Sequence, residues 1–159
     1  MIKVGDKVPS VTIREITDEG PKVVSTAEYF AGKKVAMFGL PGAFTSTCSA
    51  RHLPSFADNS DAFGAKGIDI VACISVNDAA VMKAWGEQSG SVGKVVMLSD
   101  GNGEFAREIG AEIDLSKNGM GRRSRRYSML VDDGIVRQLN LEEPGAFGVS
   151  SGDHLLTQI

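Results

Sequence analysis

Short apolar runs alternate with amphipathic segments along the chain, a pattern typical of an α/β domain. Residues 34–38 and 68–76 are nearly continuous apolar runs, as expected of central strands that are covered on both faces. Residues 94–98 form a third run of this kind. Between the first two runs, apolar side chains recur at helical spacing from Leu53 to Phe63. This spacing predicts a helix there.

Capping signals predict two further helices. Asp78 can cap a helix that follows the second strand. The inner face of that helix is expected to carry three residues, Val81, Trp85 and Gln88. Residues 104–109 form a short helix that Gly110 ends.

A hairpin and a last helix complete the chain. Residues 126–131 and 135–141 flank an Asp-Asp-Gly sequence at 132–134, which is a hairpin signature. Ser150 and Asp153 form a Ser-x-x-Asp capping box that predicts a C-terminal helix. This order of elements predicts a thioredoxin-like α/β fold, with a central mixed β-sheet flanked by helices.

Composition narrows the class of protein. The 159 residues, 42% hydrophobic and 23% charged, suit one globular domain that spans residues 1–159. A formal net charge of −3 gives no electrostatic footprint for nucleic acid. No apolar run approaches the roughly 20 residues that span a bilayer, and the N-terminal segment does not resemble a signal peptide. We therefore expect a cytoplasmic protein without nucleic-acid or membrane partners.

The cysteines are expected to act as individual thiols. Cys48 and Cys73 are the two cysteines of the chain, too few for a secreted disulfide framework. With two histidines and no paired cysteine spacing, a metal site is not expected. No cofactor is expected either.

Cys48 lies after the carboxyl end of a predicted central strand, where α/β domains have their active sites. A Pro-Gly turn at 41–42 follows the first central strand, and the hydroxyl cluster at 45–47 precedes Cys48. The cysteine thus falls in the first turn of the helix that continues to Phe63, where free N–H groups and the helix dipole favour a thiolate. The alternative is a small buried core residue, which would not require a turn followed by hydroxyls.

This loop resembles the active-site loop of peroxiredoxins, specifically of the peroxiredoxin-5-like (type II) subfamily, in its sequence PGAFTSTCSARHLP. Pro41, Thr45 and Cys48 match the subfamily pattern Pro-x-x-x-Thr/Ser-x-x-Cys. The segment GRRSRRYSMLVDDGIV resembles the strand that bears the active-site arginine, at Arg126. Similarity at CISVNDAAVMKAW and VGDKVPSVTI extends the resemblance over essentially the whole chain.

The resemblance implies a thiol-dependent peroxidase that reduces hydrogen peroxide and alkyl hydroperoxides. Cys48 would attack the peroxide and become a sulfenic acid, with Thr45 contacting the thiolate and the peroxide. Arg126 would stabilise the thiolate and polarise the O–O bond. The backbone N–H groups of Thr47 and Cys48 would hold the peroxide oxygens, and Pro41 would shield the sulfenate.

Simpler roles remain for several of these residues. Thr45 can be a helix cap, and Pro41 a turn former. Without the resemblance, Arg126 would be a solvated member of the basic run 122–126, and Arg123 would be the substitute candidate. His52 lies four residues after Cys48 and is interpreted as structural rather than as a base.

The second cysteine bears on how the enzyme is recycled. Cys73 lies in an apolar strand, which favours a buried, inert thiol over a resolving one. In some members of the subfamily a cysteine matching Cys73 is the resolving thiol. The second resolving position of the subfamily lies near the C-terminus, where this chain has no cysteine. We therefore expect an external reductant, either glutathione with glutaredoxin or thioredoxin.

The resemblance also implies an oligomeric state and further contact residues. The family implies a homodimer packed near the active-site loop, with Phe44 and residues around Trp85 as candidate contacts. Phe44 is also a candidate substrate contact.

The alternative function is a peroxide-sensing redox module that signals through oxidation of Cys48. A Cys-x-x-Cys disulfide oxidoreductase is disfavoured because position 51 is Arg51.

Overall fold

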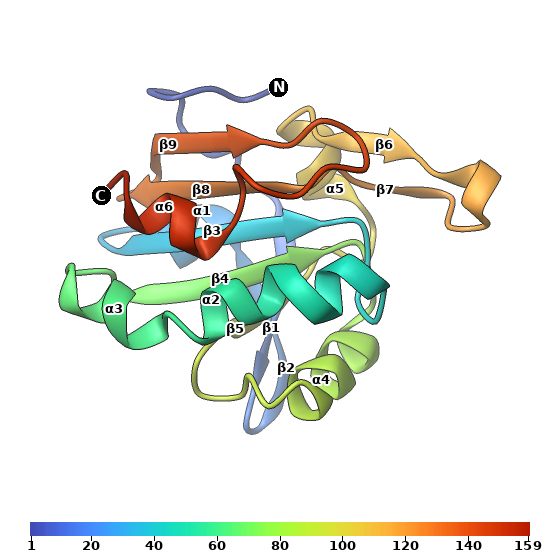
Figure 1. Cartoon of the computed structure of the whole chain (residues 1–159), viewed down its shortest axis with the longest axis horizontal. Coiled ribbons are helices and arrows are strands. Elements are labelled where there is room, and N and C mark those ends of the chain that lie inside the picture. Colours follow the sequence, from blue (N-terminus) through green and yellow to red (C-terminus); the bar gives the residue numbers. More distant parts are fainter.

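A seven-stranded mixed sheet forms the centre of the molecule in the computed structural model, which describes residues 1–159 (Figure 1). Its strand order is β2-β1-β5-β4-β3-β8-β9. β3, β4 and β5 run parallel, and the other pairs are antiparallel. The strands are β1 (Thr12–Thr17), β2 (Gly20–Ser25), β3 (Lys34–Leu40), β4 (Ile70–Ser75), β5 (Val96–Ser99), β8 (Tyr127–Asp132) and β9 (Ile135–Leu141). The prediction of a central mixed sheet flanked by helices is confirmed.

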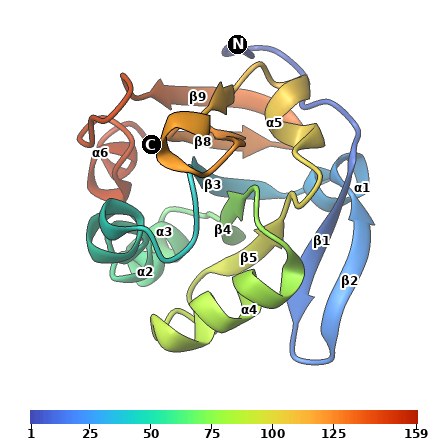
Figure 2. The ribbon, with the colours of Figure 1, turned by 90° about the vertical axis from the view of Figure 1, so that its right-hand side faces the viewer.

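Helices cover both faces of this sheet (Figure 2). One face carries α2 (Leu53–Ala57), α3 (Ser60–Ala65), α4 (Ala79–Gln88) and α6 (Gly152–Leu156). The other face carries α1 (Thr26–Phe30) and α5 (Glu104–Glu108).

The sequence of β3 shows why its apolar run is continuous. Val35 and Met37 belong to the hydrophobic core on the α1–α5 side, whereas Ala36 and Phe38 belong to the core on the α2 side. Successive side chains of a strand point to opposite faces, so a strand between two cores needs apolar residues at every position. The buried central strands were predicted on this basis.

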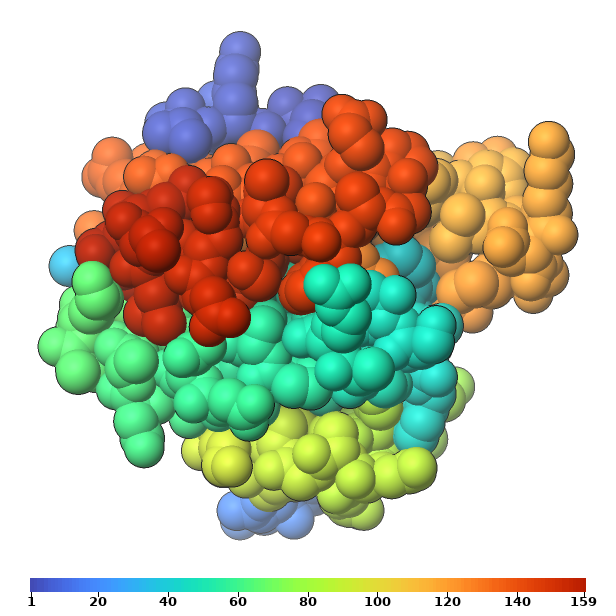
Figure 3. All heavy atoms as spheres, viewed as in Figure 1, coloured from blue at the N-terminus to red at the C-terminus, as the bar shows by residue number.

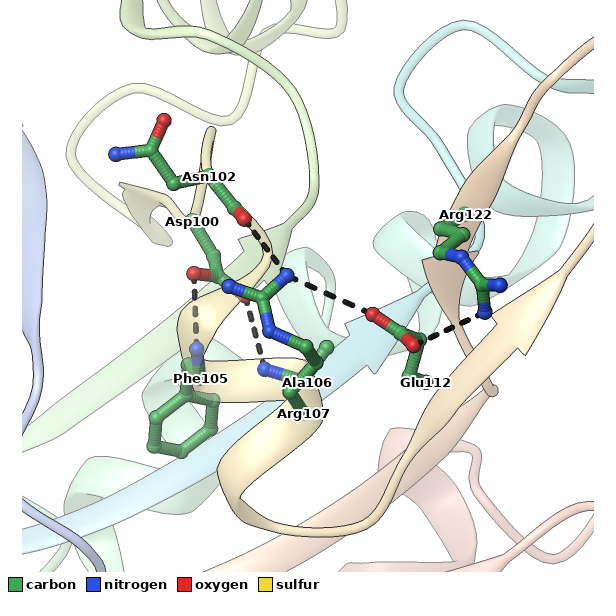
Figure 4. Close-up of polar contacts among 7 residues, drawn as sticks. All are labelled: Asp100, Asn102, Phe105, Ala106, Arg107, Glu112 and Arg122. Atoms are coloured by element: carbon green, nitrogen blue, oxygen red, sulfur yellow. Dashed lines mark hydrogen bonds and ion pairs between the residues drawn. The ribbon is translucent and has the colours of Figure 1, made fainter.

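A two-stranded arm, β6 (Glu112–Asp114) and β7 (Arg122–Ser124), projects beyond the main sheet (Figure 1). Glu112 ties this arm to α5, because its carboxylate lies 3.6 Å from Nη1 of Arg107 and 3.2 Å from Nη1 of Arg122 (Figure 4). The sequence pattern did not predict the arm, the β1–β2 hairpin or α1.

The predicted hairpin is confirmed between β8 and β9. Asp133 and Gly134 occupy its turn with φ of 48° and 78°, as a type I′ turn requires at both central positions. The arrangement places Tyr127, at the start of β8, directly opposite Leu141, at the end of β9. This register brings the residues that flank the two strands together at the same end of the sheet.

The predicted helix through Phe63 is instead three shorter segments. A π-helical turn, η1 (Cys48–His52), precedes α2, and a break at residues 58–59 separates α2 from α3. Pro54 has no N–H group to continue the regular ladder of the helix, and the Leu53 N–H donates to the Cys48 carbonyl across the wider turn. At the break, the Asn59 side chain donates to the carbonyl of Ser55 and to Asp153.

The buried face of α4 also differs from expectation. Asp78 caps α4 as predicted, but the buried face consists of Met82, Trp85 and Gly86 rather than Val81 and Gln88. No helix has the length and hydrophobicity needed to cross a bilayer.

The C-terminal helix is also capped differently. Its cap is Ser151, whose hydroxyl accepts from the His154 N–H, and not Ser150. The Ser150 hydroxyl is engaged elsewhere, because it donates to the Glu142 carboxylate over 2.7 Å. Ser150 does not cap the helix because its hydroxyl forms this tertiary hydrogen bond with Glu142 instead.

Candidate active site

Cys48 lies at the carboxyl end of β3, on the helix that follows the active-site loop. Ser46 and Thr47 are already helical, so Cys48 is the third helical residue and falls in the first turn, as predicted. Its side chain is fully buried. The loop before it is held by Asn77, whose side-chain oxygen accepts from the Ala43 N–H at 2.9 Å. The sulfur is therefore presented from a fixed loop rather than from a mobile one.

Free backbone donors accompany the sulfur. The N–H groups of Ser46, Thr47 and Cys48 have no hydrogen-bond acceptor within the chain, and the first N–H of this helix to find one is that of Ser49, which donates to Thr45. Such groups carry the positive end of the helix dipole and favour a negatively charged partner. Two of the three belong to Thr47 and Cys48, the donors that the resemblance implied.

Arg126 is the cation that reaches the sulfur. Its Nη2 donates to Sγ of Cys48 over 3.2 Å. Arg123 instead donates to the carbonyls of Met120 and Pro41, at 2.9 and 3.4 Å. Of the two candidate arginines, Arg126 is thus the one that contacts the sulfur.

His52 holds the other side of the Arg126 guanidinium. Nη1 of Arg126 lies 2.9 Å from Nδ1 of His52, and Nε2 of His52 lies 3.0 Å from the Ser150 carbonyl. Since a carbonyl can only accept, Nε2 carries the hydrogen and Nδ1 accepts from Arg126. Burial, reinforced by the charge of Arg126, lowers the pKa of His52 to about 3 although the Ser150 carbonyl opposes the shift. At neutral pH the ring is uncharged and cannot take a second proton readily, which agrees with a structural role.

The loop formed by residues 143–150 closes this side of the site. The C-terminal segment that includes it packs against the helix that bears Cys48 (Figure 3). Within the loop, the Phe147 ring faces the guanidinium carbons of Arg51 and Arg126, at 4.7 and 5.9 Å from the ring centre. The His52 ring lies 5.2 Å from the same centre. Phe147 thus helps to shield the Arg126–His52 pair.

The other predicted site residues are distributed around the loop. The Thr45 hydroxyl donates to the Gly42 carbonyl over 2.7 Å and makes no hydrogen bond to Cys48 or to the helix N–H groups. Phe44 is 44% exposed, has a left-handed φ of 64°, and faces Trp85 with 6.5 Å between ring centres. Positive φ is rare for a bulky residue and marks local strain.

A cavity of about 160 Å³ opens beside the guanidinium of Arg126. Pro41 and Thr47 line it on the side of the active-site loop, and Ile113 and Leu115 line it on the side of the projecting arm. Phe44 is not among the lining residues. The cavity is therefore lined by the charged Arg126 on one side and by the apolar side chains of Ile113 and Leu115 on another.

Cys73 is a free, fully buried thiol on β4. Burial, together with the neighbouring Cys48, raises its pKa well above the usual range, although Arg126 acts in the opposite direction. A thiol that stays protonated and buried is a poor nucleophile. The chain therefore has one sulfur next to a cation, Cys48, and a second sulfur buried in the core, Cys73.

Several residues of this site were not found from the sequence. Asn77 lies two residues after the end of β4. The end of a parallel strand is a position where polar residues serve a site, so a signal for it existed. Glu142, Phe147 and the carbonyl of Ser150 gave no such signal, because their contacts depend on the tertiary path of the chain after β9.

Comparisons with known proteins place this geometry in a family. The Redoxin family model matches residues 3–156. The chain is 51% identical over 160 residues to peroxiredoxin-2E-2, chloroplastic, of Oryza sativa subsp. japonica, covering 98% of this chain and 71% of the rice protein. It is 49% identical over 159 residues to peroxiredoxin-2E, chloroplastic, of Arabidopsis thaliana, covering 98% and 68%.

A solved structure agrees with the sequence relatives. Reduced Prx3 of Vibrio vulnificus in complex with H₂O₂ superimposes with a TM-score of 0.95 at 44% identity, covering 99% of both chains. The expected cytoplasmic location is contradicted by the two plant relatives, which are chloroplastic. Fold, site geometry and relatives agree on one identification: the chain belongs to the peroxiredoxins, the thiol-dependent peroxidases of the Redoxin family.

Proposed function

We propose that Cys48 performs the peroxidase reaction as a thiolate and passes through a sulfenic acid. The sulfur forms a bond to one peroxide oxygen while the O–O bond breaks, and the other oxygen leaves as hydroxide or alkoxide and takes up a proton. The observation that carries this proposal is the 3.2 Å contact between Nη2 of Arg126 and Sγ of Cys48. A guanidinium in that position stabilises the thiolate and lies next to the charge that develops on the leaving oxygen.

The remaining site residues take supporting roles in this proposal. The free N–H groups of Thr47 and Cys48 hold the peroxide oxygens, in keeping with their lack of partners in the chain. The Thr45 hydroxyl uses its hydrogen on Gly42, so its oxygen accepts a hydrogen bond from the peroxide. Pro41 lines the cavity beside Arg126 and keeps water away from the sulfenic acid.

Hydrogen peroxide and small alkyl hydroperoxides are the proposed substrates. A cavity of about 160 Å³ admits a short organic chain, and Ile113 and Leu115 give that chain an apolar wall. The Arg126 end of the same cavity suits the polar peroxide group.

An external thiol regenerates the enzyme in this scheme. One thiol condenses with the sulfenic acid to give a mixed disulfide and water, and a second thiol releases Cys48 and leaves as a disulfide. The burial and raised pKa of Cys73 argue against an internal resolving step. Glutathione with glutaredoxin, or thioredoxin, fits this role.

The proposed enzyme is one domain over residues 1–159 that acts as a homodimer. Phe44 is an exposed aromatic side chain with a strained backbone in the catalytic loop. Its ring faces Trp85, and it does not line the cavity beside Arg126. An aromatic residue in this position suits a contact with a second copy.

Turnover with three variants tests the proposal. The wild type, Cys48→Ser and Cys73→Ser are assayed for hydroperoxide consumption with glutaredoxin and thioredoxin systems in parallel. We expect Cys48→Ser to be inactive and Cys73→Ser to keep most of the glutaredoxin-linked activity. Consumption of about one equivalent of peroxide, without further turnover, would instead favour the sensor. A Cys73→Ser variant as inactive as Cys48→Ser would overturn the one-cysteine cycle.

A further inference from the structure

The buried carboxylate of Glu142 organises the loop beside the active site. Glu142 also lines the cavity beside Arg126, and its carboxylate makes no hydrogen bond to Cys48 or to the Arg126 side chain. One of its oxygens, Oε2, accepts from the N–H of Gly148 at 2.6 Å, the N–H of Ser150 at 2.9 Å and the hydroxyl of Ser150 at 2.7 Å. Glu142 is 4% exposed and forms no salt bridge. Burial raises the pKa of Glu142, but these hydrogen bonds outweigh burial and lower it overall.

Contacts run from this carboxylate to the catalytic sulfur. Ser150, held by Glu142, accepts the Nε2 hydrogen of His52 on its carbonyl. His52 in turn accepts from Arg126 through Nδ1, and Arg126 donates to Cys48. The backbone supports the same link, since the Glu142 N–H donates to the Arg126 carbonyl over 3.0 Å.

An arginine needs such support to serve as a fixed charge. Its long side chain has many rotamers and loses conformational entropy when immobilised, and a misplacement of about 1 Å in a site can cost about 100-fold in rate. Two contacts fix the guanidinium of Arg126, one with Cys48 and one with His52. The His52 ring can present Nδ1 only while the Ser150 carbonyl holds its Nε2 hydrogen.

We propose that Glu142 is a positioning residue for Arg126, acting through Ser150 and His52, and that it thereby sets the rate at which Cys48 reacts with peroxide. This inference rests on the proposed function of Cys48. It assigns to the carboxylate that directly follows β9 an effect on chemistry at Cys48, from which three residues, Ser150, His52 and Arg126, separate it.

Glu142→Gln tests the inference, with Glu19→Gln as the control for loss of a glutamate charge. Glutamine keeps the shape and can place its amide oxygen against the same three donors, but it removes the negative charge that strengthens these hydrogen bonds. Glu19 is exposed in the turn between β1 and β2, at the opposite edge of the sheet from β8 and β9, and does not line the cavity beside Arg126. The second-order rate constants of the reduced protein with hydrogen peroxide and with iodoacetamide are measured. The alkylation needs the thiolate but has no O–O bond for Arg126 to polarise.

We expect Glu142→Gln to lower the rate constant with peroxide by about tenfold, and to lower the peroxide-to-iodoacetamide ratio. Glu19→Gln should stay within about twofold of the wild type. A general loss of folded protein would reduce the reactive fraction without changing the ratio in this way. Wild-type peroxide reactivity in Glu142→Gln would overturn the inference.

His52 provides a second route to the same test. The amide of His52→Asn occupies the place of Nδ1 and leaves the Ser150 carbonyl without its donor. If Glu142 acts through His52, adding Glu142→Gln to His52→Asn changes the peroxide rate by less than about twofold, because neighbours on one path are not additive. Full multiplication of the two single effects would refute the path. Should Glu142→Gln not fold, His52→Asn alone decides, and a wild-type rate for it would refute the inference.

These outcomes are separable from those for the proposed function. Peroxide reduction that survives in Cys48→Ser would remove the catalytic role of Cys48 itself. A wild type that depends on Cys48, combined with a Glu142→Gln variant of normal rate, would refute only the positioning role.

Discussion

Nη2 of Arg126 lies 3.2 Å from Sγ of Cys48, although the two residues are 78 positions apart in the chain. β3 and β8 are adjacent strands of the sheet, Cys48 lies on the helix that follows β3, and Arg126 directly precedes β8. Since the two strands are antiparallel, the end of one meets the start of the other. The topology of the sheet thus pairs the sulfur with the cation.

Replacing Arg126 by lysine should slow the reaction strongly. A lysine ammonium is a compact point charge and cannot serve both Cys48 and Nδ1 of His52 in the way that a planar guanidinium does. We expect the stopped-flow rate constant with hydrogen peroxide to fall by about 100-fold. Arg122→Lys, on the exposed arm, is the control and should react at the wild-type rate. Equal rates in the two variants would contradict the role of Arg126.

Trp85 should report oxidation of Cys48. It is the single tryptophan of the chain, is buried, and donates from Nε1 to Oγ of Ser49 over 3.0 Å. Any rearrangement of the η1 turn on oxidation alters that hydrogen bond. We expect peroxide to change the tryptophan fluorescence of the wild type and to leave that of Cys48→Ser unchanged. A signal of equal size in Cys48→Ser would show that Trp85 responds to something else.

His52 should make the protein sensitive to acid. Its pKa is about 3 in the folded protein and about 6.5 when unfolded. Between these values the unfolded state binds more protons, so the stability present above pH 6.5 is lost progressively as the pH falls toward 3. At pH 4 the loss from this residue should be about 3 kcal/mol relative to pH 7.

Urea unfolding at pH 7 and pH 4 measures this effect. His52→Gln lacks the titrating ring, so its free energy of unfolding should fall less between the two pH values than that of the wild type. His154→Gln, which changes the other histidine of the chain, is the matched control. An identical pH dependence in the wild type and His52→Gln would contradict the assignment.

Asp100 should matter for stability but not for the chemistry. Its buried carboxylate accepts from the N–H groups of Phe105 and Ala106, both at 3.0 Å, at the start of α5 (Figure 4). Asp100→Ala leaves two buried donors unpaired, so we expect a loss of about 2 kcal/mol in the free energy of unfolding. Asp100→Asn keeps an acceptor and should lose less. Equal losses in the two variants would argue against the capping role.

Local patterns were sufficient to predict much of the fold. The two-sided burial of β3 and the turn at 133–134 depend on residues close in sequence, and each was recognised. The broken helix after Cys48 was not, because the apolar spacing from Leu53 to Phe63 continues across the break and does not reveal the side-chain contacts of Asn59. Ser150 was misassigned for a similar reason: Glu142 competes for its hydroxyl from another part of the chain.

The site residues also differ in whether local sequence is enough to predict them. Cys48 and the free N–H groups around it follow from the local order of strand, turn and helix. Arg126 could be chosen over Arg123 only from the family resemblance, since strand alternation leaves several arginines available. The support of Arg126 by His52 and Glu142 required the register of β8 and β9, which the sequence does not display. The roles of these residues in catalysis, and the one-domain boundary, stay predictions.

Trapping of the oxidised sulfur tests the central claim most directly. The reduced protein is treated with one equivalent of hydrogen peroxide in the presence of dimedone, which reacts with sulfenic acids, and the peptides are identified by mass spectrometry. We expect the adduct on the peptide that contains Cys48 and none on the peptide that contains Cys73. Peroxide consumed at the wild-type rate with Cys48 recovered as an unmodified thiol, or with the adduct on Cys73, would contradict the account.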